Sequence, residues 1–363
     1  MIYYPQKYRG ELAIVDKIIS SFALKGRAIS EKPFGQGHIN KTWLVETDTG
    51  ARYILQKINN NVFKDVPSLM QNVSAICSYL ATQVQDLREC LRLVRTLDGK
   101  DYLTDEEGSC FRVYEYIEDS ICLEKAESPA DFYESAVAFG RFQKLLGSFP
   151  ADTLHETIPD FHHTPKRFLN LKKAIEEDSF HRAESVRPEI EFYLSLKKEA
   201  SVLQDKRDSG VLPLRVTHND TKLNNVMFDR TTRKALCVVD IDTVMPGLAA
   251  YDFGDSIRFG ASTGAEDEQD LSKVSLDLEL YRTYTDGFVT ACDVLTDEEI
   301  KSLPFGAKLM TLENGIRFLT DYLEGDHYFS IAYPEHNLVR SRTQLKLLQE
   351  TERKWDQIQN IFK

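Results

Sequence analysis

The first part of the chain shows apolar residues at the spacing of a helix. Leu12, Val15, Ile18 and Ile19 recur at intervals of three, three and one positions, which places them on one side of a helix. We therefore expect an amphipathic helix over residues 11–22, ahead of any sheet.

Short runs rich in β-branched and aromatic residues follow this helix and favour strands. Asp48-Thr49-Gly50 lies between two of these runs and is a strong hairpin turn, so an antiparallel sheet is expected. The predicted strands span residues 28–32, 41–47, 52–57, 91–96, 102–104 and 110–117.

Helical spacing dominates the rest of the chain. Ser128-Pro129 is a helix start with proline in the first position, and Gly and Pro residues interrupt the later helices. The predicted helices span residues 66–84, 128–146, 164–177 and 187–203, and residues 276–363 form helices broken at 286–287, 304, 324–326 and 334.

The change from strands to helices divides the chain. With 363 residues the chain is longer than a single core usually supports. We expect an α+β protein with an N-terminal antiparallel sheet lobe, residues 1–117, and a larger, mainly helical C-terminal lobe, residues 118–363.

Composition and charge narrow the function classes. The net charge of −12 argues against nucleic acid or an anionic membrane as a partner, because both attract clustered cations. The N-terminus shows no secretion signal, and no apolar run is long enough to span a bilayer, so a cytoplasmic protein is expected. The oligomeric state is left open.

The cysteines are single residues, mostly in apolar surroundings, without a C-x-x-C pair. We interpret them as small buried thiols in a reducing compartment and not as zinc ligands or disulfides. They are Cys77, Cys90, Cys110, Cys122, Cys237 and Cys292.

A polar segment after residue 217 carries the strongest chemical signal. Asp220 and Asn225 lie five residues apart, in a stretch too polar for a core helix and followed by the strand-like Val226-Met227-Phe228. Phosphoryl transfer needs a carboxylate to align and deprotonate the acceptor hydroxyl, and hard oxygen ligands for Mg²⁺. Asp220 suits the first role and Asn225 the second. Turn residues of these types often only satisfy backbone groups, and the ordered series favours function.

A second metal carboxylate is expected from the neighbouring strand. Residues 235–241 are rich in β-forming residues and should pair with 226–229 through a turn. Asp240 and Asp242 close this run, and a spacing of two places both on one face of a strand. Both are candidates.

The series H-N-D-T-K-L-N-N, followed by a strand ending in Asp, resembles the aminoglycoside phosphotransferase and choline kinase superfamily. Together with D-T-V-M-P-G-L it is most similar to the N-acetylhexosamine 1-kinases, over nearly the whole chain. The resemblance implies a protein-kinase-like two-lobe fold, ATP and Mg²⁺ as cofactors, and phosphorylation of the anomeric hydroxyl of N-acetylglucosamine or N-acetylgalactosamine. It favours Asp242 as the metal ligand, because Asp242 keeps the family's spacing to Gly247.

Nucleotide contacts are expected in the first lobe. Gly35 and Gly37 lie in a strand-to-strand loop where backbone amides could approach phosphate oxygens. Lys57 lies at the end of an apolar strand, in the place of the kinase lysine that contacts the α- and β-phosphates. The alternative is that Lys57 points to solvent.

The end of the sheet lobe should contact adenine. In kinase-like folds the crossover between lobes reads the base through its backbone, which here corresponds to Glu115, Tyr116 and Ile117. One departure concerns helix 66–84, which lacks an acidic residue to hold the strand lysine. Gln71 or Asn72 could orient Lys57 instead.

Four residues are candidates for the sugar. The resemblance implies contacts from Arg317 and Tyr328, and His38 and Lys222 could converge on the same molecule if the lobes close. The alternative for Arg317 is an ion pair with Glu313 or Asp321 at helical spacing.

Two further patterns have structural explanations. Tyr251-Asp252-Phe253-Gly254-Asp255 contains a D-F-G string, and we interpret Asp252 and Asp255 as acids in the first turn of a helix. Four histidines lack carboxylates at metal-ligand spacing and are expected at the surface or at helix ends. They are His155, His162, His163 and His181.

Two competing functions remain. One is phosphorylation of another small hydroxyl acceptor, such as another sugar, an amino alcohol or an aminoglycoside, since a fold does not fix its substrate. The other is a non-catalytic nucleotide-binding module, which only the missing helix acid suggests.

Overall fold

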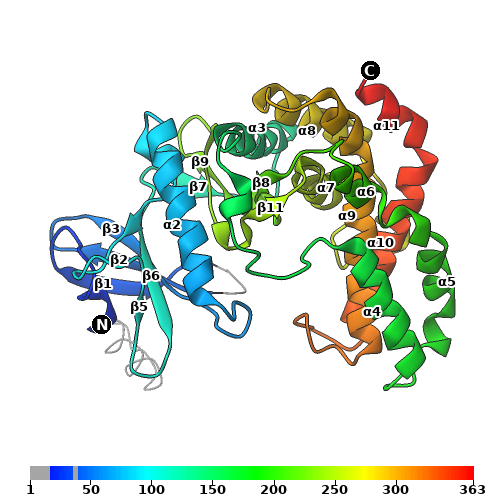
Figure 1. Cartoon of the computed structure of the whole chain (residues 1–363), viewed down its shortest axis with the longest axis horizontal. Helices are drawn as coiled ribbons and strands as arrows, with labels where there is room; N and C mark the ends of the chain where they lie inside the picture. The colour runs from blue at the N-terminus through cyan, green and yellow to red at the C-terminus, as the bar shows by residue number, and fades with distance from the viewer. Residues whose placement is uncertain (1–16, 36–39) are drawn as a thin grey trace. The chain divides into compact units, whose positions relative to one another are not determined.

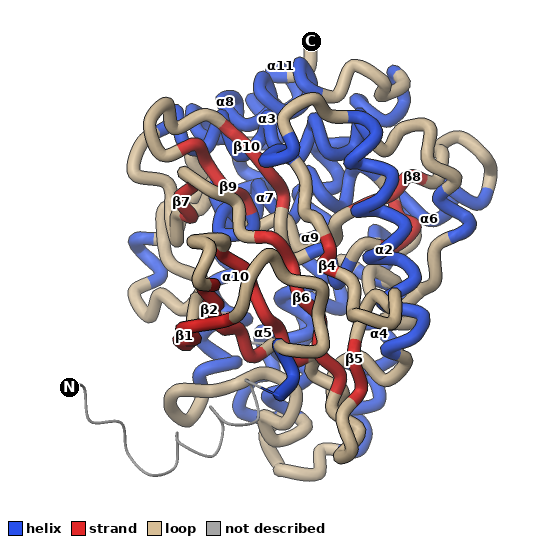
Figure 2. Tube along the Cα trace, turned by 90° about the vertical axis from the view of Figure 1, so that its left-hand side faces the viewer, coloured by secondary structure: helices blue, strands red, loops and turns tan. Residues whose placement is uncertain are grey.

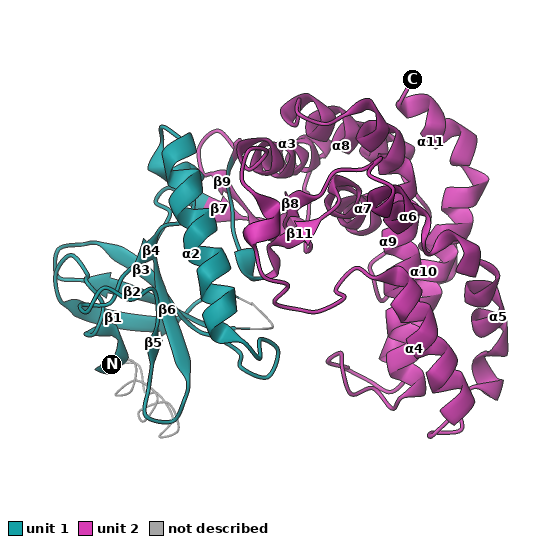
Figure 3. Cartoon of the chain, in the orientation of Figure 1, with its two compact units in different colours: residues 1–120, 236–242 teal, residues 121–235, 243–363 magenta. Residues whose placement is uncertain are grey.

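The computed structural model describes residues 17–35 and 40–363, and the chain divides into two compact units (Figure 1, Figure 3). Unit 1 comprises Met1–Ser120 and Leu236–Asp242, and unit 2 comprises Ile121–Ala235 and Thr243–Lys363. The expected α+β architecture, with an antiparallel sheet first and helices afterwards, is confirmed. The sequence analysis divides the chain after residue 117, and the structure also assigns the short segment Leu236–Asp242 to unit 1.

Unit 1 is built on an antiparallel sheet with the strand order β1-β2-β3-β6-β4, in which β5 also pairs with β6. The expected hairpin is present, because β2 and β3 pair from Lys41 opposite Lys57 to Glu46 opposite Arg52. The strands are β1 (Ala28–Pro33), β2 (Lys41–Thr47), β3 (Arg52–Lys57), β4 (Leu93–Val94), β5 (Leu103–Thr104) and β6 (Cys110–Glu115).

The helix of unit 1 is α2 (Val66–Gln83), close to the predicted 66–84. The Asp65 side chain accepts a hydrogen bond from the Ser68 backbone N–H, and Pro67 lies in the first turn, where its missing N–H is harmless. The helix contains no acidic residue. The helix therefore offers no carboxylate to hold a strand lysine, as the sequence indicates.

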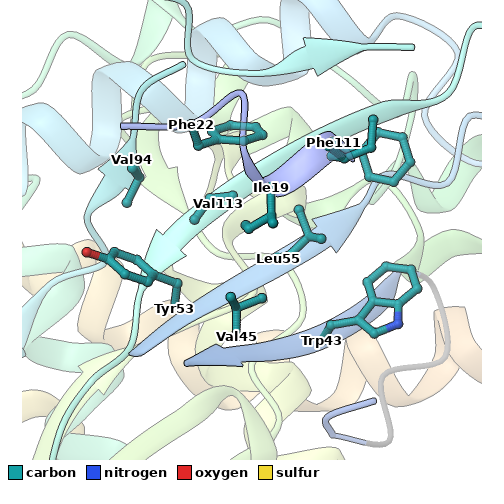
Figure 4. Close-up of a cluster of buried hydrophobic side chains, with 10 residues drawn as sticks. Ile19, Phe22, Trp43, Val45, Tyr53, Leu55, Val94, Phe111 and Val113 are labelled. Carbon is teal, nitrogen blue, oxygen red and sulfur yellow. The ribbon is translucent and has the colours of Figure 1, made fainter. Parts of the chain in front are cut away.

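One face of the sheet carries the core of unit 1 (Figure 4). Successive strand residues point to opposite faces, and the odd-numbered residues of β2, β3 and β6 share the core face. Even-numbered residues such as Gln56 therefore point to the other face. The core residues are Ile18, Ile19, Phe22, Trp43, Val45, Tyr53, Leu55, Val94, Phe111 and Val113.

Unit 2 is mainly helical, as the blue segments of Figure 2 show. Its strands are short: β7 (Ser120–Cys122) at its start, β8 (Arg215–Thr217), β9 (Val226–Asp229) and β11 (Met245–Gly247). The helices are α3 (Pro129–Leu145), α4 (Thr164–Glu177), α5 (Arg187–Ser195), α6 (Val202–Asp208), α7 (Ala249–Gly260), α8 (Leu278–Ala291), α9 (Asp297–Leu323), α10 (His336–Arg353) and α11 (Trp355–Ile361).

Helix α9 is the centre of unit 2, where it packs against α7, α10 and α4. It begins with a capping box, in which the side chains of Thr296 and Glu299 bond each other's backbone N–H groups. Its crossing with α7 is very close. A Cβ added to Gly254 would meet the Gly306 carbonyl, and one added to Gly306 would meet the Ala250 carbonyl, both well inside van der Waals contact.

Some sequence-based boundaries are wrong. The predicted helix 187–203 is interrupted, because α5 ends at Ser195 and a 3₁₀ turn at Lys197–Glu199 precedes α6. The buried positions Ile190, Tyr193 and Leu196 recur every three residues, which is the 3₁₀ period.

The glycine and proline expected to interrupt later helices lie inside α8 and α9. Gly287 is kept within α8 because a Cβ there would lie 2.9 Å from the Tyr133 carbonyl oxygen of α3. The glycine serves close helix packing and not a turn.

We predict that Gly306→Ala lowers the free energy of unfolding by about 1–3 kcal/mol, because the added methyl group forces α7 and α9 apart. Urea denaturation measures this change. Lys301→Ala, at an exposed position of the same helix, is the control and should stay within about 0.5 kcal/mol of the unmodified protein. Equal stability of the two variants would contradict the close crossing.

Candidate active site

A short polar loop lies between β8 and β9 in unit 2. β8 pairs antiparallel with β11, with Thr217 opposite Met245, and the loop ends in a 3₁₀ turn at Leu223–Asn225 that leads directly into β9. Strands at both ends of the loop hold the side chains between them in defined positions.

Three of the predicted site residues meet in this loop. Lys222 Nζ lies 2.9 Å from Asp220 Oδ1. The Asn225 side-chain amide donates to the Asp220 backbone carbonyl at 2.8 Å and to Asp220 Oδ2 at 3.3 Å. Because the amide nitrogen faces Asp220, the amide oxygen of Asn225 is the atom that could bind a cation.

Burial and nearby carboxylates act in opposite directions on Lys222. Burial lowers the pKa of the ammonium group, and the carboxylates of Asp220 and Asp255 raise it further than burial lowers it. The net pKa is above the ordinary value, so Lys222 stays charged beside Asp220.

The backbone of the loop is held by one carboxylate of α7. Asp252 is fully buried and accepts hydrogen bonds from the backbone N–H groups of His218, at 2.9 Å, and Asn219, at 2.8 Å. Gln143 of α3 donates to the same carboxylate at 2.8 Å. Burial raises the pKa of Asp252, which these hydrogen bonds and His218 oppose.

A second set of hydrogen bonds joins α7 to Thr221. The Asp255 carboxylate accepts from the Thr221 N–H at 3.1 Å, and Ser256 Oγ donates to the Thr221 carbonyl at 2.7 Å. The D-F-G string lies inside α7, where Asp252 is in the first turn, as predicted, and Asp255 lies beyond it. The sequence analysis missed that these acids hold the loop, which no local pattern reveals.

A buried histidine links the loop to α9. His162 Nδ1 lies 2.8 Å from Glu313 Oε1, and His162 Nε2 lies 3.2 Å from the backbone carbonyl oxygen of Asn219. Thr164 donates to the other oxygen of Glu313 at 2.7 Å. The two ring nitrogens of His162 thus lie beside oxygens of two different segments, Glu313 on α9 and Asn219 in the loop.

Glu313 is charged in this arrangement. Burial acts to raise its pKa, but His162, Arg167 and Arg317 together lower it below the ordinary value. The expectation that His162 lies at the surface is wrong. His163 fits the expectation, since it caps the start of α4.

Arg317 lies among aromatic rings of unit 2. Its guanidinium carbon is 5.3 Å from the ring centre of Phe329, 5.6 Å from that of Phe161 and 5.8 Å from that of Tyr328. This brings the predicted pair Arg317 and Tyr328 together. Phe161 precedes His162, so the segment that contacts the catalytic loop also contacts Arg317.

The alternative partners of Arg317 have other functions. Asp321 accepts the backbone N–H groups of His327, Tyr328 and Phe329 and so fixes the loop that carries Tyr328. Tyr328 itself is 67% exposed. Arg317 and the ring of Tyr328 thus lie side by side and form a polar and aromatic surface.

In unit 1, Lys57 lies on the core face of the sheet. Its Nζ is 5.6 Å from the ring centre of Phe111, a core residue, and Lys41 lies directly opposite on β2. The two lysines line a cavity of about 300 Å³ together with Asn59 and Ser109, among other residues. This placement argues against the predicted alignment of Lys57 with the kinase strand lysine.

The opposite face carries a buried ion pair. Arg112 of β6 lies beside Gln56 of β3 in the ladder, and its guanidinium donates to Gln56 Oε1 at 2.8 and 3.0 Å. Arg112 also pairs with Asp242, at 2.5 Å between Nη1 and Oδ1 and 2.8 Å between Nη2 and Oδ2. The sequence analysis did not predict Arg112, because nothing marks an arginine in a strand as paired.

The prediction that Asp240 and Asp242 share one face of a strand is wrong. β10 (Ala235–Val238) ends before them, Asp240 has a left-handed backbone with φ 58°, and Ile241–Thr243 is a 3₁₀ turn. Asp240 is exposed, whereas Asp242 is buried and bound by Arg112. This argues against Asp242 as a metal ligand.

The glycine-rich loop is described in part. Gly35 has φ 75°, a conformation that favours glycine, and a Cβ there would meet nothing within 4 Å. Gly37 and His38 lie outside the described residues. Asn40, which follows them, donates to Asp242 Oδ2 at 2.7 Å.

The predicted adenine contacts lie at the end of β6. The Glu115 N–H donates to the Arg92 carbonyl and the Tyr116 N–H to the Arg52 carbonyl. An adenine contact here would therefore use carbonyl groups or Ile117.

Comparison with known families identifies the class of protein. The chain matches the Phosphotransferase enzyme family (APH) over residues 30–284 and belongs to that family. It is a phosphotransferase with a kinase-like fold, which confirms the predicted enzyme class and fold.

Solved structures share the fold at low sequence identity. An aminoglycoside phosphotransferase from Alicyclobacillus acidocaldarius is 12% identical with a TM-score of 0.60, and 98% of each chain is covered. A microcompartment-associated aminopropanol kinase is 16% identical, with TM-score 0.56 and coverage of 96% of this chain and 98% of that one. An amicoumacin kinase bound to AMP-PNP and Ca²⁺ is 13% identical, with TM-score 0.59 and coverage of 97% and 94%.

Among residues 17–35 and 40–363, none of the helices has the length and apolar character needed to cross a bilayer.

We predict that Asp252→Asn lowers the free energy of unfolding by about 1–3 kcal/mol and also lowers turnover. The amide offers one acceptor in place of two, so a buried N–H of His218, Asn219 or Gln143 loses its partner. Urea denaturation and steady-state kinetics measure the two effects.

Asp208→Asn, at an exposed position of α6, is the matched control and should change neither quantity. Unchanged stability of Asp252→Asn would show that this carboxylate does not hold the loop.

Proposed function

We propose that the protein transfers the γ-phosphoryl group of ATP to the anomeric hydroxyl of an N-acetylhexosamine and so forms the sugar 1-phosphate. The observation that carries the proposal is the grouping of Asp220, Lys222 and Asn225 on a loop fixed by buried hydrogen bonds. Membership of the phosphotransferase family supports the reaction type. The motif strings around Asp220 and Asp242 support the sugar.

Asp220 is the proposed base. Its carboxylate is about one-quarter exposed and is oriented by Lys222 and Asn225 on two sides. It would align the acceptor hydroxyl and take its proton as the bond to phosphorus forms. Lys222 pairs with this carboxylate and could donate a hydrogen bond to the acceptor.

The oxygen donors fit Mg²⁺. Within the described residues, the structure contains no group of three or more His, Cys, Asp or Glu side chains that could hold a metal ion. Mg²⁺ in kinases is bound by one or two protein oxygens together with phosphates and water, so it would arrive with the nucleotide. Bound Mg²⁺ would neutralise the β- and γ-phosphate oxygens.

We propose Asn225 and Asp240 as the protein ligands of this metal. Asp240 is preferred to Asp242 because Asp240 is exposed, while the Asp242 carboxylate is bound by Arg112 and Asn40. In unit 1 the backbone at Gly35 and Gly37 would contact phosphate, and Glu115–Ile117 would contact adenine. Because Lys57 lies on the core face, we assign it no phosphate contact.

The acceptor site is proposed at the aromatic cluster of unit 2. The rings of Phe161, Tyr328 and Phe329 can cover the apolar face of a pyranose, and Arg317 can donate to its hydroxyl or acetamide oxygens. His38 is proposed to contribute from the glycine-rich loop.

The charges of this cluster disfavour a cationic acceptor such as an amino alcohol. Burial and the neighbouring Arg317 lower the pKa of Arg167, which shows that two cations lie close together. The nearby acid, Glu313, is already bound by His162 and Thr164. A neutral sugar adds no further positive charge.

We predict that Asp220→Asn lowers turnover by a factor on the order of 10² or more, because the positioned base is lost. Binding of ATP, measured by calorimetry, should be nearly unchanged. Asp286→Asn, at an exposed position of α8, is the control and should keep full turnover. Turnover within a few-fold of the unmodified enzyme in a folded Asp220→Asn protein would remove Asp220 from this role.

We predict that Arg317→Ala raises the KM for the sugar about tenfold or more, since hydrogen bonds to a charged donor are lost, and leaves the KM for ATP nearly unchanged. Steady-state kinetics with N-acetylglucosamine, N-acetylgalactosamine, glucose and choline measures acceptor preference. Identification of the phosphorylated position completes the experiment.

Arg340→Ala is the matched control, because Arg340 also lies over an aromatic ring, with its guanidinium carbon 5.5 Å from the centre of Phe318. It should leave the KM for the sugar unchanged. Equal use of choline, or phosphate on a hydroxyl other than the anomeric one, would exclude the hexosamine proposal and leave the phosphotransferase class intact.

A further inference from the structure

The face of the unit 1 sheet opposite the core differs from the usual kinase arrangement, in which an acid on a helix holds a strand lysine. Helix α2 carries no acidic residue, and the β3 residue on the face opposite the core is the neutral Gln56. A cation and a carboxylate are nevertheless buried on that face. They are Arg112, 1% exposed, and Asp242, 3% exposed.

We propose that the Arg112–Asp242 ion pair is a positioning unit that holds the turn bearing Asp240 against the sheet, and so fixes Asp240 for the metal–nucleotide complex. The inference rests on the proposed function, in which Asp240 binds the metal. Arg112 and Asp242 are positioning residues and need not touch the nucleotide.

The geometry ties separate strands to this turn. The guanidinium of Arg112 contacts both oxygens of Asp242 and also donates twice to Gln56 Oε1. The pair is therefore fixed on both β3 and β6. A planar guanidinium that bonds in two directions restricts the carboxylate in rotation as well as in distance.

Asn40, which follows the glycine-rich segment, is hydrogen-bonded to the Arg112–Asp242 pair. Its amide donates to Asp242 Oδ2 at 2.7 Å, and its Oδ1 accepts from the Asn59 backbone N–H at 3.0 Å. The residue that follows the predicted phosphate loop is thus bonded to the carboxylate two positions after Asp240.

The short backbone segment between Asp240 and Asp242 links the position of one aspartate to the direction of the other. Asp240 has φ 58°, and Ile241–Thr243 forms a 3₁₀ turn, so the direction of the exposed Asp240 carboxylate follows from where Asp242 is held. A left-handed aspartate is uncommon outside turns and persists where its surroundings fix it.

Stability alone does not account for such a pair. Removing two charges from water costs several kcal/mol, and well-packed apolar residues of similar volume are often as stable as a buried ion pair. The pair can therefore be replaced without unfolding the protein, which makes its positioning role testable.

The test uses Arg112→Met/Asp242→Leu, which replaces the pair by apolar side chains. Its unfolding temperature should fall by no more than about 5 °C. Its affinity for Mn²⁺·AMP-PNP, measured by calorimetry and by electron paramagnetic resonance of Mn²⁺, should fall about tenfold or more, as when residues that orient metal ligands are removed. Affinity for AMP-PNP with metal chelated should change little.

Two further variants guard against a folding artefact. Asn40→Ala leaves the ion pair in place and should weaken Mn²⁺·AMP-PNP binding by a few-fold, because one hydrogen bond to Asp242 is lost. Lys17→Met/Glu106→Leu removes an exposed ion pair of the same unit and should leave the binding unchanged.

Unchanged Mn²⁺·AMP-PNP affinity in the Arg112→Met/Asp242→Leu protein would overturn the inference. So would a greater loss of the Mn²⁺ signal in Asp242→Asn than in Asp240→Asn, because Asp242 would then be a ligand itself. These measurements need no acceptor. If they agree with the inference and no sugar is phosphorylated, the proposed function fails and the positioning role stands.

Discussion

The active-site loop depends on one buried carboxylate, that of Asp252. Burying a carboxylate is costly unless hydrogen bonds satisfy its oxygens, and here the donors include the backbone N–H groups of His218 and Asn219. The loop can therefore adopt its observed path only when α7 is in place. Asn219 has a left-handed backbone, φ 66°, and the hydrogen bonds from the N–H groups of His218 and Asn219 to Asp252 stabilise this conformation.

Unit 1 uses the same physical device. Asp242 is buried and fully engaged, as Asp252 is, and the exposed residue two positions before it is Asp240. In unit 2 the partly exposed residue that follows the held peptide is Asp220. In each unit a buried carboxylate fixes a short turn, and the reactive candidate lies beside it with its own carboxylate accessible. One residue thus fixes the backbone, and a residue near it in sequence carries the carboxylate that is available for chemistry.

The sequence predicted local patterns well. The strands β2 and β3, the proline-initiated helix α3 and the polar loop around Asp220 follow from residue composition, helix caps and turn chemistry, and the structure contains them. It could not predict contacts between distant segments. His162 was expected at the surface or at a helix end. It is buried beside Glu313, and this partner could not be predicted because it lies 151 residues further along the chain.

The placement of Lys57 illustrates a second limit, which concerns the face of a strand. Gln56 and Lys57 are neighbours, and a shift of one residue exchanges the core face for the opposite face. The lysine was the natural candidate for a phosphate contact, yet the register of β3 with β6 places Gln56 beside Arg112. Only the pairing of the whole strand, which includes Tyr53 and Leu55 in the core, decides this.

This arrangement has a consequence for how phosphate charge is met. On the face of the unit 1 sheet opposite the core, Arg112 lies 2.5 Å from Asp242, which balances its charge. In the proposed enzyme this ion pair would therefore offer little net positive charge to a nucleotide. A lysine free to approach the α- and β-phosphates would have supplied that charge itself. Backbone N–H groups near Gly35 carry only partial charges. In the proposed enzyme the metal would therefore neutralise a larger share of the phosphate charge than in kinases with a strand lysine, and the direction of the carboxylate of Asp240, its proposed ligand, would matter correspondingly more.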